Sequence, residues 1–308
     1  MTENHTDRLT RAQEDLQVLL AEILPRDGNL DLGSGLAAYR RGAASELVHG
    51  ESSLAFCLIA QGAKELFLGD SIFVYDKDNY LITSFQLPTI SHIVEASPEK
   101  PYLSIKLDLD PAMVSSVLLA SAQLTMAAED TAAFNVTRVD ADLMETVVRL
   151  VRVSQNTAEA QFLMPMVKRE LIFRLLMGSH GGRLSQIAGM GPTSQRISSA
   201  LRSLREEFDQ PLRIPEIAQR SGMSVSSFHD HFKRVTGLTP LQYQKHLRLR
   251  EARRLLLSQD IDVANAGFQV GYNDASHFNR DYKKLFGQSP MRDIESLREA
   301  GPLALSAS

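Results

Sequence analysis

The sequence predicts an α+β protein whose strands come first in the chain and whose helices follow. Short apolar runs separated by turn residues fill roughly residues 54–110, helical periodicity replaces them after Asp110, and the chain reads as helix beyond Pro192. With 308 residues and 44% hydrophobic content, the chain is long enough to build two domains.

The strand signals are apolar runs that end at turn residues. Residues 54–60 form an apolar run closed by Gln61-Gly62, and Gly69-Asp70 separates two further runs, which predicts a hairpin. Turn clusters at 76–79 and 97–101 each precede another strand. Short strands at this spacing predict a small sandwich or barrel.

Helices are expected from Asp110-Pro111, from Asp140 and over about 159–177, because each segment has helical apolar periodicity. Such a stripe is either core or a seam between subunits. We take as dimerisation candidates Leu143, Val147, Leu150, Leu171 and Leu175. Glycine clusters at 178–182 and 189–192 predict a junction between domains at 1–190 and 193–300, and residues 301–308 are expected to be a disordered tail.

The most informative feature is a repeat near the C-terminal end. Residues 228–240, FHDHFKRVTGLTP, are followed fifty residues later by 278–290, FNRDYKKLFGQSP. Aromatic, basic, glycine and Ser/Thr-Pro positions coincide in the two copies. This coincidence indicates one supersecondary unit that is used twice.

Each copy predicts a helix, a tight turn and a second helix. In the first copy we expect a helix over 214–220, a turn at Gly222, and a second helix that Ser224 caps and that Phe228 and Phe232 anchor. The second copy repeats these parts as helix 263–268, turn 271–273, cap Asp274, and anchors Phe278 and Tyr282, with a long helix over 241–257 between the copies. In both copies the face opposite the anchors is left free.

These residues resemble the signature of the AraC/XylS family of transcription regulators over about 214–294. The resemblance is carried by residues 222–228, Phe232-Lys233, Gly237, Pro240, Tyr243, Arg248-Leu249, Ala252, Leu255-Leu256, Gly271-Tyr272, Phe278, Arg280, Lys283, Phe286-Gly287 and Ser289-Pro290. Residues 58–64, 96–103 and 107–111 are similar to the cupin-like regulatory domain of one branch of this family.

The resemblance implies a cupin-like β-barrel over about 35–110, a helical dimerisation segment over about 111–177, and an all-helical DNA-binding domain with two helix-turn-helix units. It implies a sequence-specific transcription regulator, either an activator or a repressor, that responds to an unknown small-molecule effector; activator is the term we use for it here. The expected partners are double-stranded DNA, RNA polymerase and a second copy of the chain.

In this family the second helix of each unit lies in the major groove, here helices 224–234 and 274–284. The base-reading positions would be Ser226, His229, Asp230, Ser276, His277, Asn279 and Arg280. The phosphate-contacting positions would be Lys233, Arg234, Lys283 and Lys284. The chain departs from its relatives at position 230, where they commonly carry a basic residue and this chain carries Asp230.

Charge, cysteine content and hydropathy narrow the class of protein. Residues 196–299 hold 17 Lys and Arg against 13 Asp and Glu within a chain of net charge -4, so the repeat region is the basic part. A single cysteine and an N-terminus without an apolar signal segment favour the cytoplasm, and no run is long enough to suggest a membrane span.

Each alternative function that we considered is supported by only one or two isolated residues. A redox or repair-linked regulator would act through Cys57, which lies in an apolar strand without an adjacent base or cation, as an inert core cysteine would. A metal-dependent enzyme would need clustered histidines, and the spacing of His229 and His231 falls on an expected recognition helix. We therefore expect no enzyme activity, metal or cofactor. A pure interaction module is suggested only by Asp230.

Overall fold

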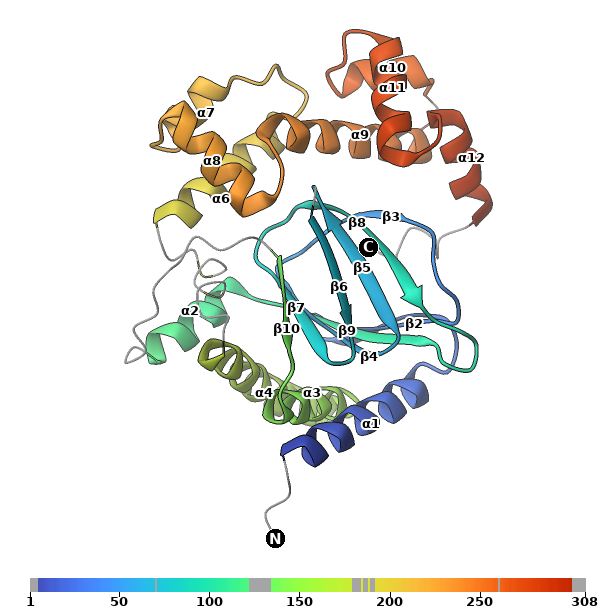
Figure 1. Ribbon diagram of the computed structural model, residues 1–308, viewed down its shortest axis with the longest axis vertical. Helices are drawn as coiled ribbons and strands as arrows, with labels where there is room; N and C mark the ends of the chain where they lie inside the picture. Colours follow the sequence, from blue (N-terminus) through green and yellow to red (C-terminus); the bar gives the residue numbers. More distant parts are fainter. Residues whose placement is uncertain are drawn as a thin grey trace.

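Two antiparallel β-sheets form the N-terminal half of the protein in this computed structural model, which describes residues 5–69, 71–121, 134–178, 184, 188, 192–259 and 261–300 (Figure 1). The six-stranded sheet has the order β1 (Gly28–Gly33), β2 (Leu36–Arg41), β9 (Tyr102–Asp108), β4 (Ala55–Gln61), β7 (Asn79–Thr83) and β10 (Phe134–Arg138). The four-stranded sheet has the order β3 (Val48–Glu51), β8 (Pro88–Glu95), β5 (Ala63–Leu68) and β6 (Ser71–Asp76).

The α+β class is confirmed, whereas the expectation of a closed barrel is wrong. Neither sheet order returns to its first strand, so β1 and β10 remain the edges of one sheet and β3 and β6 the edges of the other. The hairpin expected around Gly69 is present, because Leu68 pairs with Ser71 and Ala63 with Asp76. The turn residues had located strand ends correctly, but closure depends on pairing between distant strands, which local signals do not reveal.

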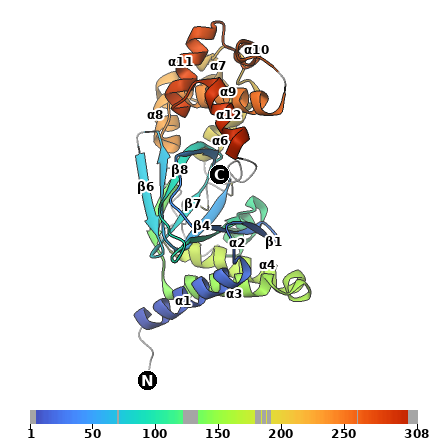
Figure 2. The same ribbon diagram turned by 90° about the vertical axis from the view of Figure 1, so that its right-hand side faces the viewer.

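Four helices cover the outer face of the six-stranded sheet (Figures 1 and 2). They are α1 (His5–Ile23), α2 (Pro111–Ala120), α3 (Ala141–Ser154) and α4 (Thr157–Met177). The expected caps are present: the Asp110 carboxylate accepts from the Ala112 amide, and the Asp140 carboxylate accepts from the Leu143 amide. The apolar residues of alternate sheet positions pack with these helices in one core.

The five residues expected to form a dimer seam lie in this core instead. Leu143, Val147, Leu150, Leu171 and Leu175 are between 0 and 3% exposed. The sequence therefore identified the apolar face of α3 and α4 correctly. This face packs against other elements of the same chain, whereas a contact with a second subunit was expected. A periodic stripe marks the buried face of a helix and does not say what buries it.

The sequence analysis did not predict several elements, namely α1, β1, β2, β3, β8 and β10. Helix α1 buries Ala12, Leu16 and Leu20, which follow one another at four-residue intervals in an otherwise charged segment. Strand β10 pairs antiparallel with β7, with Phe134 opposite Thr83. Both segments carried a usable signal: the interval of four in α1, and in β10 the alternation of Phe134 and Val136 with Asn135 and Thr137.

The C-terminal half is entirely helical in its described residues. Its elements are α6 (Pro192–Glu206), α7 (Ile214–Arg220), α8 (Val225–Thr236), α9 (Pro240–Ser258), α10 (Val263–Gln269), α11 (Ala275–Phe286) and α12 (Pro290–Ala300). Helix α9 extends between two compact groups, with α7 and α8 near one end and α10 and α11 near the other (Figure 1). Most of the two glycine clusters, Asp70 of the expected hairpin turn, and the expected tail 301–308 lie outside the described residues.

The β-sheets contact both groups of helices. At the hairpin between β5 and β6, Gly69 approaches the backbone of Gly237 so closely that an added Cβ would collide with the Gly237 carbonyl oxygen. The His49 ring of β3 lies edge-on against Phe286, with 4.8 Å between the ring centroids. The Glu51 carboxylate pairs with the Arg250 guanidinium of α9 at 3.4 Å. The N-terminal half therefore contacts the end of α8, the middle of α9 and the end of α11.

Candidate nucleic-acid interface

Helices α8 and α11 are built as two copies of one design. The Ser224 hydroxyl accepts from the Ser227 amide at the start of α8, and the Asp274 carboxylate accepts from the His277 amide at the start of α11. At the other end Gly237 and Gly287 adopt φ of 72° and 80° and donate their amides to the Lys233 and Lys283 carbonyls. Both helices have 12 residues; the two N-caps were expected from the sequence, and the two glycine C-caps end each helix two residues beyond the expected ends at 234 and 284.

The turns before these helices need glycine for a backbone reason. Gly222 has φ of 64° and Gly271 has φ of 87°, a region that side chains with a Cβ rarely adopt. At Gly271 a Cβ would also collide with the Asp209 carbonyl oxygen. The two expected turns are thus confirmed, and each directs its second helix away from the first.

Aromatic anchors hold one face of each helix inside the protein. Phe228 and Phe232 of α8, and Phe278 and Tyr282 of α11, are fully buried. The rings of Phe228 and Phe232 lie 5.4 Å apart and those of Phe278 and Tyr282 lie 5.6 Å apart, in the tilted and edge-on arrangements that aromatic pairs favour. The opposite face of each helix is consequently turned to solvent.

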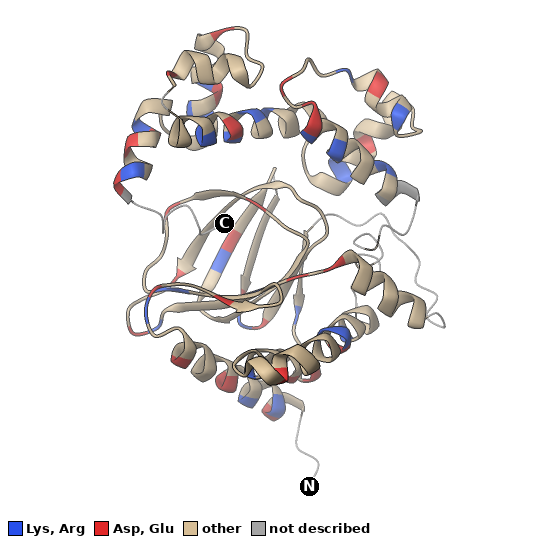
Figure 3. Cartoon of the chain, turned by 180° about the vertical axis from the view of Figure 1, so that it is seen from behind, with Lys and Arg blue, Asp and Glu red and all other residues tan. Residues whose placement is uncertain are grey.

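Every residue expected to contact DNA is exposed on that outer face. On α8 these are Ser226, His229, Asp230, Lys233 and Arg234. On α11 they are Ser276, His277, Asn279, Arg280, Lys283 and Lys284. Lys and Arg are also frequent along α9 (Figure 3). The fold therefore presents two polar helix faces that carry hydrogen-bond donors, with basic residues toward the C-terminal end of each.

Some of these side chains are already held by neighbours in the protein. His277 Nε2 lies 3.5 Å from the Asp281 carboxylate, and its ring packs edge-on against Tyr272. The Asn279 amide donates to the Ala275 carbonyl at 2.8 Å, so it must reorient before it can bond to a base edge. His231 contacts the Arg234 guanidinium. No group of three side chains suited to a metal ion occurs in the described part of the chain.

Lys284 is exposed to solvent and also lines a hollow in the protein surface. This hollow has a volume of about 270 Å³ and lies between the four-stranded sheet and helices α9 and α11. Phe67, Pro88 and Ile90 form the sheet side of this hollow, and His246 lies on the α9 side. Burial and the neighbouring Arg250 and Lys245 lower the pKa of His246 to about 4.

Arg248, which belongs to the family signature, joins the two helical groups. Its guanidinium donates to the carbonyls of Phe208 at 2.7 Å, of Gln210 at 2.8 Å and of Gly271 at 2.8 Å. One side chain of α9 thereby connects the segment before α7 to the turn of the second unit. Backbone carbonyls carry no sequence signal, so spacing alone could not identify this role.

A second group of contacts, missed in the sequence, fixes α11 to its neighbours. The buried Asp293 carboxylate of α12 accepts two hydrogen bonds from Arg253 of α9, at 2.8 and 2.6 Å, and one from the Tyr282 hydroxyl at 2.7 Å. The Arg253 guanidinium also lies over the Phe286 ring, 4.4 Å from its centroid. Three helices therefore meet at one carboxylate behind the exposed face of α11.

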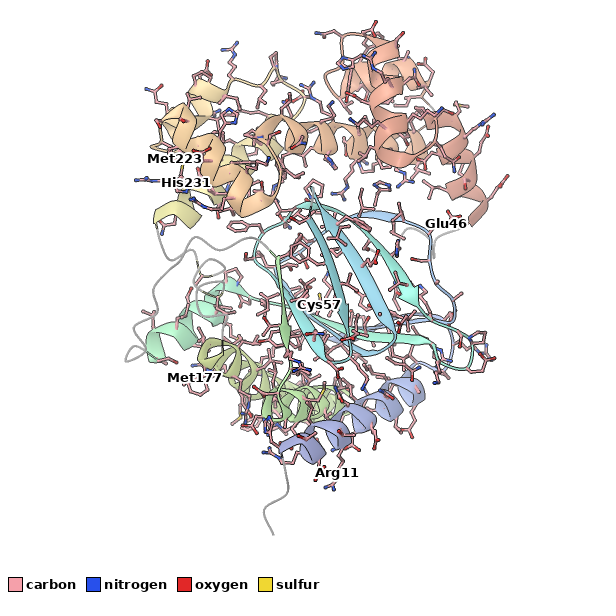
Figure 4. The ribbon with its side chains drawn as sticks, viewed as in Figure 1. Arg11, Glu46, Cys57, Met177, Met223 and His231 are labelled. Carbon is pink, nitrogen blue, oxygen red and sulfur yellow. The ribbon has the colours of Figure 1, made fainter. Side chains whose placement is uncertain are left out.

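Cys57 lies among the strands of the N-terminal half (Figure 4). Burial raises the pKa of its thiol, and Lys106 and Lys64 act in the opposite direction. The expectation of no nearby cation is wrong, because strand pairing places Lys106 opposite Cys57. A protonated, enclosed thiol does not favour the cysteine-dependent alternative.

Comparison with known proteins follows this division of the chain. Residues 34–183 match the family model described as AraC-type transcriptional regulator N-terminus, and residues 217–295 match a helix-turn-helix domain model. The chain belongs to the AraC/XylS family of transcription regulators. The first model begins six residues after the start of β1, and the second spans both helix-turn-helix units.

Two curated AraC/XylS relatives are HTH-type transcriptional activators named RhaS. The Escherichia fergusonii protein is 31% identical over 163 residues, which is 53% of this chain and 58% of that protein. The Citrobacter koseri protein is 29% identical over 163 residues with the same coverage. The chain thus spans little more than half the length of these curated relatives.

The fold of the whole chain is similar to that of ToxT from Vibrio cholerae. The structure of ToxT with a bound unsaturated fatty acid covers 90% of this chain and 99% of that one, with a TM-score of 0.54 and 9% identity. At this identity the likeness concerns the fold alone. In the described part of the chain, no helix combines the length and apolar character needed to cross a bilayer.

Proposed function

We propose that this protein is a sequence-specific activator of transcription that reads two successive major grooves of DNA with α8 and α11. The observation that carries the proposal is the pair of matching helices, each anchored on one face and exposing polar and basic side chains on the other. A generic helical bundle has no reason to repeat caps, turns, anchors and basic ends in register. The activators named RhaS among its relatives support the direction of regulation.

The length of α9 suits this reading. Its 19 residues span about 28 Å at 1.5 Å per residue. One turn of B-DNA repeats every 34–36 Å, about the spacing needed for two helices to enter successive major grooves on one side of the duplex. The bonds from Arg248 to both helical groups would keep the two recognition helices at a constant separation.

The base-reading roles follow from side-chain chemistry. Arg280 can bond bidentately to guanine, and Asn279 to adenine once it releases Ala275. Asp230 can accept from cytosine N4 but cannot make the guanine contact. Lys233, Arg234, Lys283 and Lys284 would contact phosphates, which add affinity without sequence information. The two units would therefore read different bases.

We also propose a homodimer, formed by the outer face of α4. Phe162, Met166, Phe173 and Met177 lie on one side of this helix and are 77, 59, 45 and 55% exposed. If two α4 helices pair antiparallel about a two-fold axis at their middle, each Phe faces a Met of the partner, Phe162 opposite Met177 and Met166 opposite Phe173. Arg169 then faces Glu170. This self-complementarity is what a two-fold interface requires.

Regulation by an effector would act through the contacts between the sheets and the helices. Gly69, His49 and Glu51 reach the end of α8, the end of α11 and the middle of α9. A change in the sheets would thus alter the position of both recognition helices. ToxT, a protein of this fold, binds an unsaturated fatty acid, which supports a ligand-responsive regulator. RNA polymerase is the partner that an activator of this family needs.

The proposal is tested by selecting DNA sites from a random pool with the full chain. We expect two short conserved blocks about one helical turn apart, and log K that falls with log salt by about 0.9 per phosphate contacted. Arg280→Ala should relax one block, whereas Arg292→Ala, a change of an Arg outside the recognition helices, should leave both. A pool without enrichment, or binding independent of salt, would contradict the proposal.

A further inference from the structure

Helix α11 carries a buried carboxylate one helical turn after His277, which is expected to read a base. Asp281 is 7% exposed, whereas the His277 side chain is 54% exposed. An acid is thus enclosed directly behind a side chain that is turned to solvent. Burying a carboxylate is costly unless polar or charged groups compensate it, so the neighbours of Asp281 indicate what it does.

Three side chains from three parts of the domain meet one oxygen of Asp281. Its Oδ2 lies 3.0 Å from Lys245 Nζ of α9, 3.3 Å from the Tyr272 hydroxyl and 3.5 Å from His277 Nε2. The imidazole of His277 also packs edge-on against the Tyr272 ring, with 5.9 Å between the centroids. Tyr272 in turn lies under the Arg248 guanidinium. The imidazole is therefore held on two sides, and one carboxylate contacts both the imidazole and its aromatic neighbour.

Asp293, which is also buried, is bound much more tightly. Its two oxygens accept from the Arg253 guanidinium at 2.8 and 2.6 Å, and one of them accepts from the Tyr282 hydroxyl at 2.7 Å. The contacts of Asp281 are all longer than the 2.7–2.9 Å that is typical, to about a tenth of an ångström, of charge-assisted hydrogen bonds. Asp281 therefore does not have the geometry of a tight tie between helices, and the imidazole can approach it further when the ring gains a proton.

The first helix-turn-helix unit cannot form the same arrangement. In the repeat, the residues fifty positions before the tyrosine, the histidine and the carboxylate are Gly222, Ser227 and His231. Glycine and serine have no ring, and His231 has no carboxylate and contacts the Arg234 guanidinium instead. The orientation of a base-reading histidine is thus controlled in the second unit alone.

The imidazole of His277 borders a hollow of about 240 Å³ between the start of α9 and the turn before α11. The charged and titratable side chains around this hollow are Lys245, Arg248, Tyr272, Asp274 and Asp281. Two cations and two carboxylates balance one another there, and the Asp274 carboxylate also accepts from the His277 amide at 2.6 Å. A DNA phosphate brought to this face adds negative charge, which favours the protonated imidazole.

A ring that is held in one orientation gives its two nitrogens different roles. The hydrogen bond made by one nitrogen of a histidine determines the tautomer, and the nitrogen that faces a carboxylate carries the proton. Nε2 of His277 faces Asp281, so Nδ1 remains for DNA. In the neutral ring Nδ1 accepts a hydrogen bond, as from adenine N6 or cytosine N4. In the protonated ring it donates, as to guanine O6 or N7.

We propose that Asp281 is a positioning residue that keeps a proton on Nε2 of His277, so that Nδ1 alone reads the base and the preferred base changes with the charge of the ring. This inference rests on the proposed function and concerns the specificity of α11. The neutral ring selects a base with an amino group in the major groove, and the protonated ring selects guanine. Without the carboxylate the ring can turn and offer either nitrogen, so the preference is lost.

The test is selection of DNA sites by the full chain at about pH 6 and about pH 8, within and above the range in which histidine usually titrates. We expect one position in the block read by α11 to change from adenine or cytosine at the higher pH to guanine at the lower pH. Asp281→Asn, which removes the charge and keeps the size, should abolish this change. It should also reduce the preference at that position about tenfold, as loss of one charged hydrogen bond does.

Lys245→Met separates positioning from a structural tie between α9 and α11. It removes the tie and leaves the carboxylate beside His277, so the change of preferred base with pH should persist. Variants at the exposed position 277 test the role of each nitrogen, because an asparagine amide can take the place of Nδ1 and a glutamine amide that of Nε2. His277→Asn should retain one base preference at both pH values, and His277→Gln should lose it.

A double variant gives the decisive comparison. In the His277→Gln background, Asp281→Asn should have no further effect on base preference, whereas an added effect would show a structural role and overturn the inference. A wild-type preference that is the same at both pH values, or one that changes equally in Asp281→Asn, would overturn it too. Two enriched blocks without the change with pH leave the proposed function standing, whereas a pool without enrichment removes both.

Discussion

Replacing Asp293 by alanine should destabilise the second helix-turn-helix unit strongly. The carboxylate is buried and accepts from the Arg253 guanidinium twice and from the fully buried Tyr282 hydroxyl once. Its loss leaves an enclosed cation and an enclosed donor without partners. Breaking a buried ion pair by removing one partner costs about 3–5 kcal/mol, and an unsatisfied buried donor costs about 1–3 kcal/mol. Because the two costs overlap, we expect the free energy of unfolding to fall by about 4 kcal/mol.

A matched control for this variant is the ion pair of Arg254, the residue that follows Arg253 on α9. Arg254 donates to Glu251 at the same distances, 2.8 and 2.6 Å, but this pair lies at the surface. Glu251→Ala should cost less than about 1 kcal/mol, because water screens exposed pairs and solvates the remaining arginine.

The measurement is urea unfolding of both variants, followed by far-ultraviolet circular dichroism, together with binding to a selected DNA site. Asp293→Ala should also weaken contact with the DNA block read by α11, since that helix loses its connection to α9 and α12. Equal losses of stability in the two variants would show that burial does not set the strength of these pairs, and the reasoning would fail.

Three other predictions concern recognition, assembly and pH. Arg280→Ala should cost about 1–3 kcal/mol of DNA binding and relax the base preference at one or two positions; unchanged binding in a competition assay would show that the recognition surface lies elsewhere. Asp230→Arg should switch a preferred base if Asp230 reads cytosine. If Asp230 only repels phosphate, the same change should raise affinity for all sequences. Phe162→Glu combined with Phe173→Glu should give a folded monomer in analytical ultracentrifugation, whereas a wild type that is monomeric at micromolar concentration would exclude the α4 interface. Burial, aided by Arg253, lowers the pKa of His49 to about 4, so only the unfolded chain takes up a proton as the pH falls from about 6.5. The free energy of unfolding should therefore fall by up to about 3 kcal/mol between about pH 6.5 and 4. His49→Phe should remove this part of the pH dependence, as measured by unfolding titrations at several pH values.

The helix-turn-helix units were predictable because their signals are local. Ser224 and Asp274 act within a few residues of their own positions, so the sequence predicted the starts of α8 and α11 correctly, whereas both helices extend two residues beyond the expected ends at 234 and 284. The anchors Phe228 and Phe278 were found by the same argument, since a spacing of four residues places side chains on one helix face.

What escaped prediction depends on contacts between distant segments. Lys64 and Lys106 lie on strands of different sheets, and only the pairing of those strands brings them near Cys57. Asp293 and Arg253 are 40 residues apart. In α4 the sequence has apolar residues on two faces, and periodicity alone could not tell that Leu171 lies inside and Phe173 outside.

The length of helix α9 constrains which insertions this protein can tolerate, because α9 sets both the distance and the angle between the two helix-turn-helix units. Inserting one residue into an α-helix rotates everything beyond it by about 100° and advances it by about 1.5 Å. Such an insertion would turn α10 and α11 away from the duplex, and it would break the bonds of Arg248, which reach both sides of α9. Under the proposed mode of DNA binding, new target sites would arise through substitutions on the exposed faces of α8 and α11, while the distance between the two blocks of a site would stay constant.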